Sequence, residues 1–106
     1  MKNENFMSES MKYLKKDYSD LYEGIVTLNE NVFSGKVLDL KTQKLIAIAM
    51  VCGTSDDRAI EAQMKNGMQT CDISAEEIVD VLRIVLLISG KPAFTKSLEI
   101  LYSLVK

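Results

Sequence analysis

Four charged residues with catalytic potential follow an apolar run of the chain: Asp56, Asp57, Arg58 and Glu61. On a helix, one turn places Asp57, Arg58 and Glu61 close together. A carboxylate there can act as a general acid or base, and an arginine can hold a substrate carboxylate through two parallel hydrogen bonds. We therefore take Asp57, Arg58 and Glu61 as candidate catalytic residues acting on a small carboxylate. The same residues are also typical of an ordinary solvated helix start, where acidic groups match the helix dipole and Glu61 pairs with Lys65.

Thiol chemistry depends on Cys52 and Cys71, the two cysteines of the chain. If the segments before and after the turn form an antiparallel hairpin, the two sulfur atoms lie at its opposite ends, beyond disulfide reach. We expect two reduced thiols that fill space in the core, and a redox role requires pairing between subunits. The chain has no histidine, which excludes Ser-His-Asp and Cys-His catalysis and histidine metal ligation.

One further charge is out of place, because Arg83 lies in the very apolar segment IVDVLRIVLLIS. A buried arginine needs a carboxylate partner or an anionic ligand. Asp80, Asp57 or Glu61 could supply the carboxylate. The sequence has no metal-ligand spacing and no glycine-rich phosphate loop, so we expect neither metal nor cofactor.

Length and composition indicate one globular domain over residues 1–106, with 47% hydrophobic residues and a formal net charge of -2. Such a charge balance gives no electrostatic footprint for nucleic acid. The longest apolar run, residues 45–52, is too short to span a bilayer, and the charged N-terminal segment has no signal-peptide core. We expect a cytoplasmic protein that binds neither membranes nor nucleic acid.

One proline, five glycines and few aromatic residues favour an all-α fold. Apolar spacing predicts helices over residues 4–16, 20–33 and 40–52, with Ser19 and Asp39 as caps of the second and third. Gly53 is expected to end the third helix, and Thr54 or Ser55 to cap a fourth that Gly67 ends near residue 66.

The last two helices also have clear sequence signals at their starts. Ser74 and Glu77 form a capping box for the fifth, and Pro92 suits the first turn of the sixth. The face predicted for the sixth helix comprises Phe94, Leu98, Leu101, Tyr102 and Val105.

The third and fifth predicted helices are apolar on nearly every side. Four amphipathic helices cannot easily cover both, so the surplus apolar surface indicates a homo-oligomer. The alternative is that this pair simply forms the centre of the bundle.

The order of these features resembles the carboxymuconolactone decarboxylase family, which includes the AhpD-like alkylhydroperoxidases. The matching segments are KTQKLIAIAM with the polar turn after it, AIEAQMKNG, SAEEIVDVL and SGKPAF, together about residues 38–94. This resemblance implies a six-helix, all-α AhpD-like subunit that assembles as a homo-oligomer, often a hexamer.

The AhpD-like branch works through a glutamate, a CxxC pair and a histidine. The glutamate position is occupied here by Lys44, the cysteine positions by Asp56 and Ala59, and the histidine position by Gln63. The thiol relay is therefore absent, and Cys52 cannot be mapped onto it.

Three functions follow from the residues and the resemblance. The first is a decarboxylase-type enzyme acting on a small carboxylate or lactone, with Asp57, Arg58 and Glu61 at its site. The second is a non-catalytic binding or structural oligomer. The third, peroxiredoxin activity of the AhpD-like kind, has only the family resemblance and an intersubunit use of Cys52 or Cys71 to support it.

Overall fold

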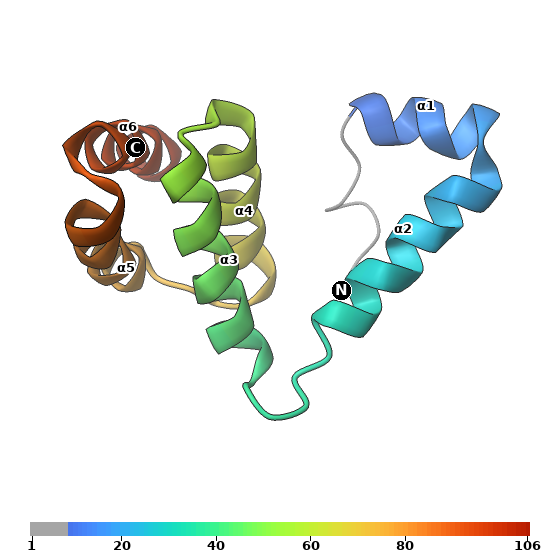
Figure 1. Ribbon diagram of the computed structural model, residues 1–106, viewed down its shortest axis with the longest axis horizontal. Coiled ribbons are helices and arrows are strands. Elements are labelled where there is room, and N and C mark those ends of the chain that lie inside the picture. Colours follow the sequence, from blue (N-terminus) through green and yellow to red (C-terminus); the bar gives the residue numbers. More distant parts are fainter. Residues whose placement is uncertain (1–8) are drawn as a thin grey trace. The chain divides into compact units, whose positions relative to one another are not determined.

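The computed structural model describes residues 9–106, which form six α-helices and no strand (Figure 1). The all-α prediction is confirmed for this part of the chain. The first predicted helix was expected from residue 4, and its beginning lies outside the described residues. The helices are α1 Glu9–Asp17, α2 Ser19–Val32, α3 Leu40–Thr54, α4 Asp57–Thr70, α5 Ala75–Ser89 and α6 Lys91–Val105.

The chain divides into two compact units, with the boundary between Lys36 and Val37. The first contains α1 and α2, which pack on each other. Lys15 Nζ lies 5.7 Å from the centre of the Tyr22 ring, within cation–π range. The predicted Ser19 cap is wrong: Tyr18 occupies the N-cap position without a side-chain hydrogen bond, and α2 already includes Ser19.

The second unit is a bundle of α3, α4, α5 and α6, in which α3 contacts each of the other three (Figure 1). Apolar side chains from all four helices fill its centre, because each helix has apolar residues on the side that faces the others. A fully buried side chain of this kind contributes about 1.5–3 kcal/mol. The fully buried hydrophobic residues are Ile48, Cys52, Ile60, Met64, Ile78, Leu82 and Leu101.

The turn between α3 and α4 differs from the prediction in both of its caps. Gly53 does not end α3; it lies inside the helix, and Ser55 takes the left-handed C-cap conformation with φ 61°. Neither Thr54 nor Ser55 caps α4, because the Asp56 side chain accepts the Ala59 N–H at 3.0 Å. At the other end of α3, the predicted Asp39 cap is confirmed, since its Oδ1 accepts the Thr42 N–H at 2.8 Å.

Gly67 also lies inside its helix, where a stop was predicted, and α4 continues to Thr70. A Cβ atom at Gly67 would lie 3.0 Å from Ile73 Cδ1 and 3.2 Å from Ile48 Cδ1. Glycine is therefore used here for close packing of α4 on α3, rather than for chain reversal.

Helices α5 and α6 begin as predicted. Ser74 and Glu77 form the capping box, with Ser74 Oγ accepting the Glu77 N–H and Glu77 Oε1 accepting the Ser74 N–H. Pro92 lies in the first turn of α6. The predicted face of α6 is only partly right, because Leu101 is buried whereas Tyr102 and Val105 are exposed.

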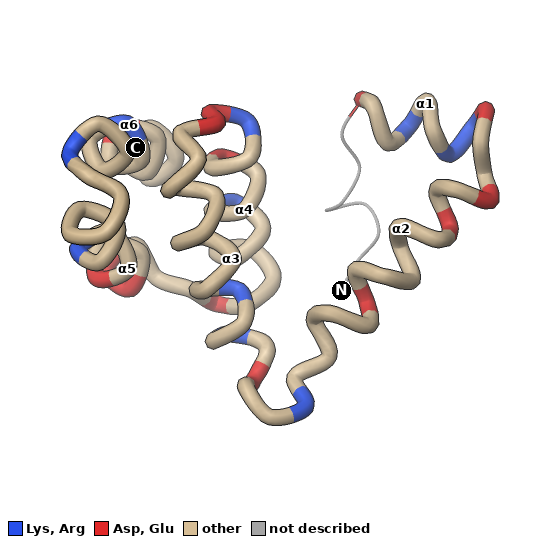
Figure 2. Tube along the Cα trace, viewed as in Figure 1, with Lys and Arg blue, Asp and Glu red and all other residues tan. Residues whose placement is uncertain are grey.

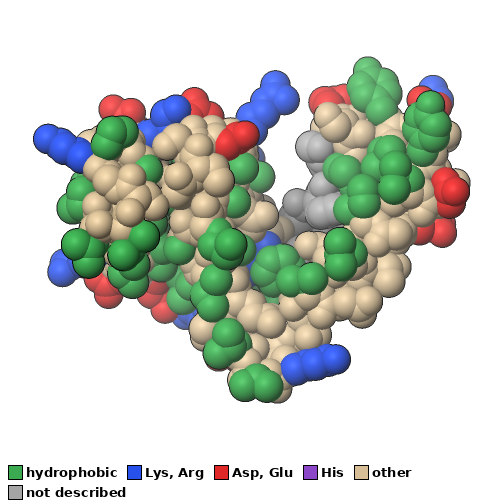
Figure 3. Space-filling view, in the orientation of Figure 1, with side chains coloured by type: hydrophobic (Ala, Val, Ile, Leu, Met, Phe, Trp, Pro, Cys, Tyr) green, Lys and Arg blue, Asp and Glu red, His purple; other side chains and the backbone are tan. Residues whose placement is uncertain are grey.

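The two most apolar helices are not buried all round within the subunit, and both keep the surplus apolar surface that their composition predicts. On α3, Met50 is 70% exposed, and on α5 the exposed residues include Ile84, Leu87 and Ile88. Figure 3 shows hydrophobic side chains over α5 on the visible face. Among the described residues, no helix has the length and apolar character needed to cross a membrane.

Candidate functional site

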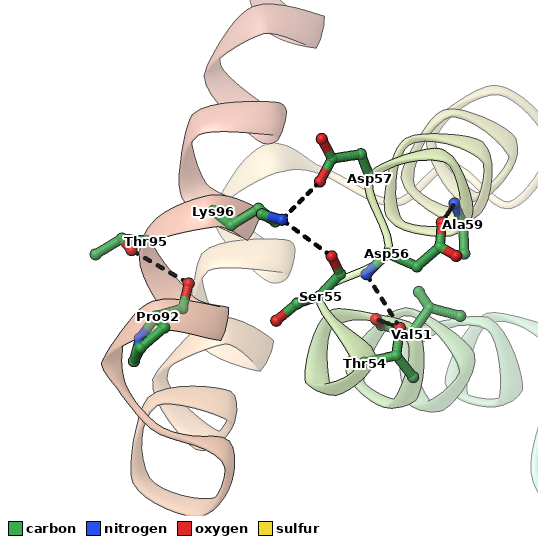
Figure 4. Close-up of polar contacts among 9 residues, drawn as sticks. All are labelled: Val51, Thr54, Ser55, Asp56, Asp57, Ala59, Pro92, Thr95 and Lys96. Carbon is green, nitrogen blue, oxygen red and sulfur yellow. Dashed lines mark hydrogen bonds and ion pairs between the residues drawn. The ribbon is translucent and has the colours of Figure 1, made fainter.

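The turn from α3 to α4 carries the charged residues that suggested catalysis (Figure 2). Lys96, from α6, reaches this turn, where its Nζ lies 3.1 Å from Asp57 Oδ1 and donates to the Ser55 carbonyl at 3.1 Å (Figure 4). The Asp57 side chain is 71% exposed, so this ion pair is largely solvated. The contact holds α6 against the turn and gives Asp57 a structural partner.

The other two candidates, Arg58 and Glu61, are exposed on α4 within the subunit. Asp56, the fourth charge of the group, is engaged as the N-cap of α4. The catalytic role of Asp57, Arg58 and Glu61 therefore stays a prediction.

Arg83 is not buried as the sequence suggested. Its Nε lies 3.4 Å from Asp80 Oδ1, one helical turn earlier on α5, and the two side chains are 77% and 78% exposed. Of the three carboxylates considered, Asp80 is thus the one that meets Arg83, as a surface pair.

A different polar pair lies between α3 and α4, with Lys44 buried and Gln63 partly buried. Lys44 is only 3% exposed, and its Nζ donates a hydrogen bond of 3.0 Å to Gln63 Oε1 on α4. Burial lowers the pKa of Lys44, because a charged ammonium is less stable away from water, while the nearby Cys71 thiol acts in the opposite direction.

The periodicity of both helices explains why these side chains meet. Residues Lys44, Ile48 and Cys52 follow one another at steps of four along the buried stripe of α3. On α4, Gln63 lies four residues before Gly67, the residue that packs against Ile48. The absence of a side chain at Gly67 allows α3 and α4 to approach closely, and the long side chain of Lys44 reaches Gln63 Oε1 across this contact.

From the sequence, Lys44 and Gln63 were identified only as replacements for two residues of the AhpD-like motif. Nothing predicted that the two side chains are in contact. A signal was nevertheless present, because Lys44 is a charged residue on a helical stripe whose next two members, Ile48 and Cys52, are core residues. Lys44 and Gln63 stand at the positions where the AhpD-like motif has its glutamate and its histidine. Here the Lys44 amine and the Gln63 amide are hydrogen-bonded to each other.

Both thiols are free, as expected. Cys52 is completely buried and burial raises the pKa of its thiol, which the nearby Ser97 hydroxyl offsets only in part. Cys71 is partly buried at the C-cap of α4, where its Sγ lies 3.6 Å from Thr70 Oγ1. A buried neutral thiol is a poor nucleophile, so the environment of Cys52 is that of a core residue.

Within residues 9–106, no three acidic, cysteine or histidine side chains gather in a way that could hold a metal ion. The polar groups of this site are therefore an amine, an amide and the solvated charges at the start of α4.

Comparison with known proteins places this geometry in context. The sequence model described as "Carboxymuconolactone decarboxylase family" matches residues 19–102. The chain is 59% identical over 104 residues to "Uncharacterized protein MJ0742" of Methanocaldococcus jannaschii, covering 98% of this chain and 100% of that protein. It is 37% identical over 92 residues to "Uncharacterized protein MJ1511" of the same organism, covering 87% of this chain and 85% of the relative.

Proposed function

Because the chain belongs to the carboxymuconolactone decarboxylase family, we propose that it is a decarboxylase-type enzyme that handles a small carboxylate or lactone. The observation that carries the proposal is the partly buried hydrogen bond between Lys44 Nζ and Gln63 Oε1. It lies at the two positions where the resembled relay has its glutamate and histidine. The enzyme works without that thiol relay, because Asp56 and Ala59 stand at the two cysteine positions.

The Lys44–Gln63 pair suits this class of substrate chemically. An ammonium group attracts a carboxylate or polarises a lactone carbonyl, and it does so more strongly away from water than at the surface. The Gln63 amide offers both a hydrogen-bond acceptor and donors, so it can orient the amine and a bound oxygen atom.

In this proposal, the start of α4 contributes the second group of residues. Arg58 guides the anionic substrate, and Asp57 and Glu61 are the candidate acid-base carboxylates. Their exposure in the isolated subunit is compatible with such a role if a neighbouring subunit covers this turn.

The proposal is tested by binding and turnover of γ-butyrolactone-γ-carboxylate, a small lactone that carries a carboxylate. We expect binding to the wild-type protein and a loss of about tenfold or more in affinity for Lys44→Met, because a hydrogen bond to a charged group is removed. Lys41→Met is the matched control, because Lys41 lies one turn earlier on α3 and is partly exposed. Equal binding by all three proteins would show that Lys44 is not part of the site.

A non-catalytic binding or structural oligomer is the second candidate, and the exposed apolar residues of α5 favour it. Ile84, Leu87 and Ile88 occupy one face of the helix at spacings of three and four, and they are 62%, 82% and 75% exposed. We propose that this face packs against further copies of the chain, in a hexamer such as the family resemblance implies, in the cytoplasm. Sedimentation of wild type and Leu87→Glu tests this: the variant should dissociate, and a wild-type monomer would refute it.

AhpD-like peroxiredoxin activity is the third and least favoured candidate. The burial of Cys52 and the raised pKa of its thiol oppose attack on a peroxide. Peroxide consumption that disappears in Cys52→Ser or Cys71→Ser would establish this activity, and unchanged peroxide consumption in both variants would exclude a role for either thiol.

A further inference from the structure

Helices α3 and α5 lie side by side and run in the same direction. Near their first turns, Lys41 Nζ pairs with Glu77 Oε2 at 2.9 Å. Near their ends, a Cβ atom at Gly53 would lie 3.0 Å from Ser89 Oγ. Both contacts join residues 36 positions apart in the sequence, so the two helices stay in step between them.

Exposed apolar side chains follow the line along which these two helices meet. Positions three and four apart share one face of a helix. Such steps lead from Gly53 back along α3, and from Glu77 forward along α5, to exposed apolar residues beside both contacts. These residues form one surface, the α3–α5 face, which comprises Ile46 and Met50 from α3 and Ile84, Leu87 and Ile88 from α5.

The α3–α5 face has the size of the apolar centre of a protein interface. Its five side chains are between 45% and 82% exposed. An aliphatic side chain buries about 60–120 Å² in a core, so the five present about 200–400 Å² at their exposure. Each partner of a stable complex buries about 800 Å², with an apolar centre inside a polar rim. The face therefore supplies about a quarter to a half of one partner's share.

The chemistry of the face fits a second copy of this chain. Segments 45–54 and 84–89, which supply it, contain no charged residue. Such a surface does not repel its own copy, whereas helices that bind anionic membranes carry Lys and Arg beside their apolar side. Elsewhere on α3 to α6 the exposed large apolar residues are fewer: Leu40, Leu86, Tyr102 and Val105. The face is thus its own best complement, and a two-fold axis brings two identical faces together.

We propose that two copies of the chain pack through their α3–α5 faces, around a two-fold axis that passes between Met50 and Ile84. This rests on the oligomer put forward above as the second candidate function and deepens it. The interface now includes α3 as well as α5, and its symmetry is specified.

The first test is sedimentation of the whole chain and of three glutamate variants, because a glutamate is costly to bury in an apolar interface. Met50→Glu changes the face on α3 and Leu87→Glu changes it on α5. Tyr102→Glu is the control, since Tyr102 is 60% exposed on α6, outside the face. We expect both face variants to lose about half or more of the sedimenting mass, because a two-fold contact joins copies in pairs. The control should keep the wild-type mass.

The outcomes separate this inference from the candidate on which it rests. If Leu87→Glu dissociates the oligomer and Met50→Glu does not, α3 lies outside the interface. The inference then fails, and the oligomer built through α5 stands. A wild-type monomer would refute both.

Crosslinking tests the two-fold axis. Met50→Cys and Ile84→Cys are each made in a Cys71→Ser background, in which the remaining natural thiol is fully buried. A short bismaleimide should join each introduced thiol to the same residue of a second copy, and it should not do so in Tyr102→Cys. In a head-to-tail contact the face would meet a different surface, such as the exposed Leu28 of α2. Absence of linked dimers from both face variants would overturn the two-fold arrangement.

Discussion

Replacing Gly67 with alanine tests how closely α3 and α4 must pack to bring Lys44 and Gln63 together. The added Cβ atom would lie 3.0 Å from Ile73 Cδ1 and 3.2 Å from Ile48 Cδ1. Both neighbours are buried, with 4% of Ile73 and none of Ile48 exposed, so neither methyl group has open space into which it can move. One of them, or one of the helices, must shift by a few tenths of an ångström.

Two opposing free-energy changes set the size of the effect. Alanine is preferred over glycine inside a helix by about 0.5–1 kcal/mol. Overpacking of a closed core costs about 1–3 kcal/mol. We therefore expect Gly67→Ala to lower the free energy of unfolding by about 1–2 kcal/mol, since the packing cost exceeds the helix gain.

Gly53→Ala is the matched control in the same four-helix unit. Its Cβ atom would lie 3.0 Å from Ser89 Oγ, a single hydroxyl at the end of a side chain that can rotate away. Gly24→Ala in α2 measures only the preference of a helix for alanine over glycine, since a Cβ atom there has no neighbour within 4 Å. We expect Gly24→Ala to be stabilising by about 0.5–1 kcal/mol and Gly53→Ala to lie between the other two.

The assay is urea unfolding followed by far-ultraviolet circular dichroism, combined with lactone binding for each variant. If Gly67→Ala were as stabilising as Gly24→Ala, the close contact of α3 and α4 at this position would be wrong. In that case Gly67 would no longer explain the approach of Lys44 to Gln63.

Four further predictions concern charge, caps and strain. Burial lowers the pKa of Lys44 below 10.5, so between the lowered pKa and pH 10.5 the unfolded chain binds more protons than the folded protein. The free energy of unfolding should therefore rise with pH in this range, and it should rise less in Lys44→Met. Ser74→Ala removes the α5 cap and should cost about 1 kcal/mol in urea unfolding. Lys96→Met removes a largely exposed ion pair and should cost at most about 1 kcal/mol. Ser55→Gly relieves a left-handed conformation and should raise the free energy of unfolding by about 0.5–1 kcal/mol.

Each of these predictions has its own contradicting outcome. Identical alkaline stability profiles of wild type and Lys44→Met would contradict the desolvation of that amine. An unchanged urea midpoint for Ser74→Ala would contradict the stabilising role of the capping box. If Lys96→Met lowered the free energy of unfolding by several kcal/mol, the estimate of at most about 1 kcal/mol for this solvated ion pair would be wrong. Asp72→Gly is the control for Ser55→Gly, because Asp72 also has a positive φ, of 55°, which aspartate tolerates better than serine does. An equal increase in the free energy of unfolding in both variants would contradict the argument.

The fold was largely predictable because its signals are local. The Asp39 cap, the Ser74–Glu77 capping box and Pro92 each act within one helical turn, and the structure confirms all three. The family resemblance is confirmed as well, over residues 19–102.

The errors occurred where tertiary contacts decide the outcome. Glycines such as Gly53 and Gly67 are usually helix stops, but here α3 and α4 continue through them. Gly67 is needed inside α4 because Ile48, nineteen positions earlier in the sequence, approaches it closely. Ser55 takes the left-handed cap that glycine was expected to occupy, which single-residue preferences could not reveal.

The candidate site was predicted less well than the fold. The sequence drew attention to charges that turned out to be exposed in the subunit, such as Arg58 and Glu61. Lys44 was noticed only as a departure from a motif, because its burial depends on α3 packing against α4 and is invisible in its local sequence. The available signal was the position of Lys44 on the same helical stripe as Ile48 and Cys52, which indicates a buried charge as strongly as the cluster at the turn indicates a site.

The most direct test of the central claim, that Lys44 and Gln63 form a site for a small carboxylate or lactone, is a calorimetric titration. γ-Butyrolactone-γ-carboxylate is titrated into wild type, Lys44→Met, Gln63→Leu and the control Lys41→Met. The account predicts binding by wild type and the control, with a loss of about tenfold or more in both site variants. No binding by folded wild type, or equal binding by all four proteins, would contradict it.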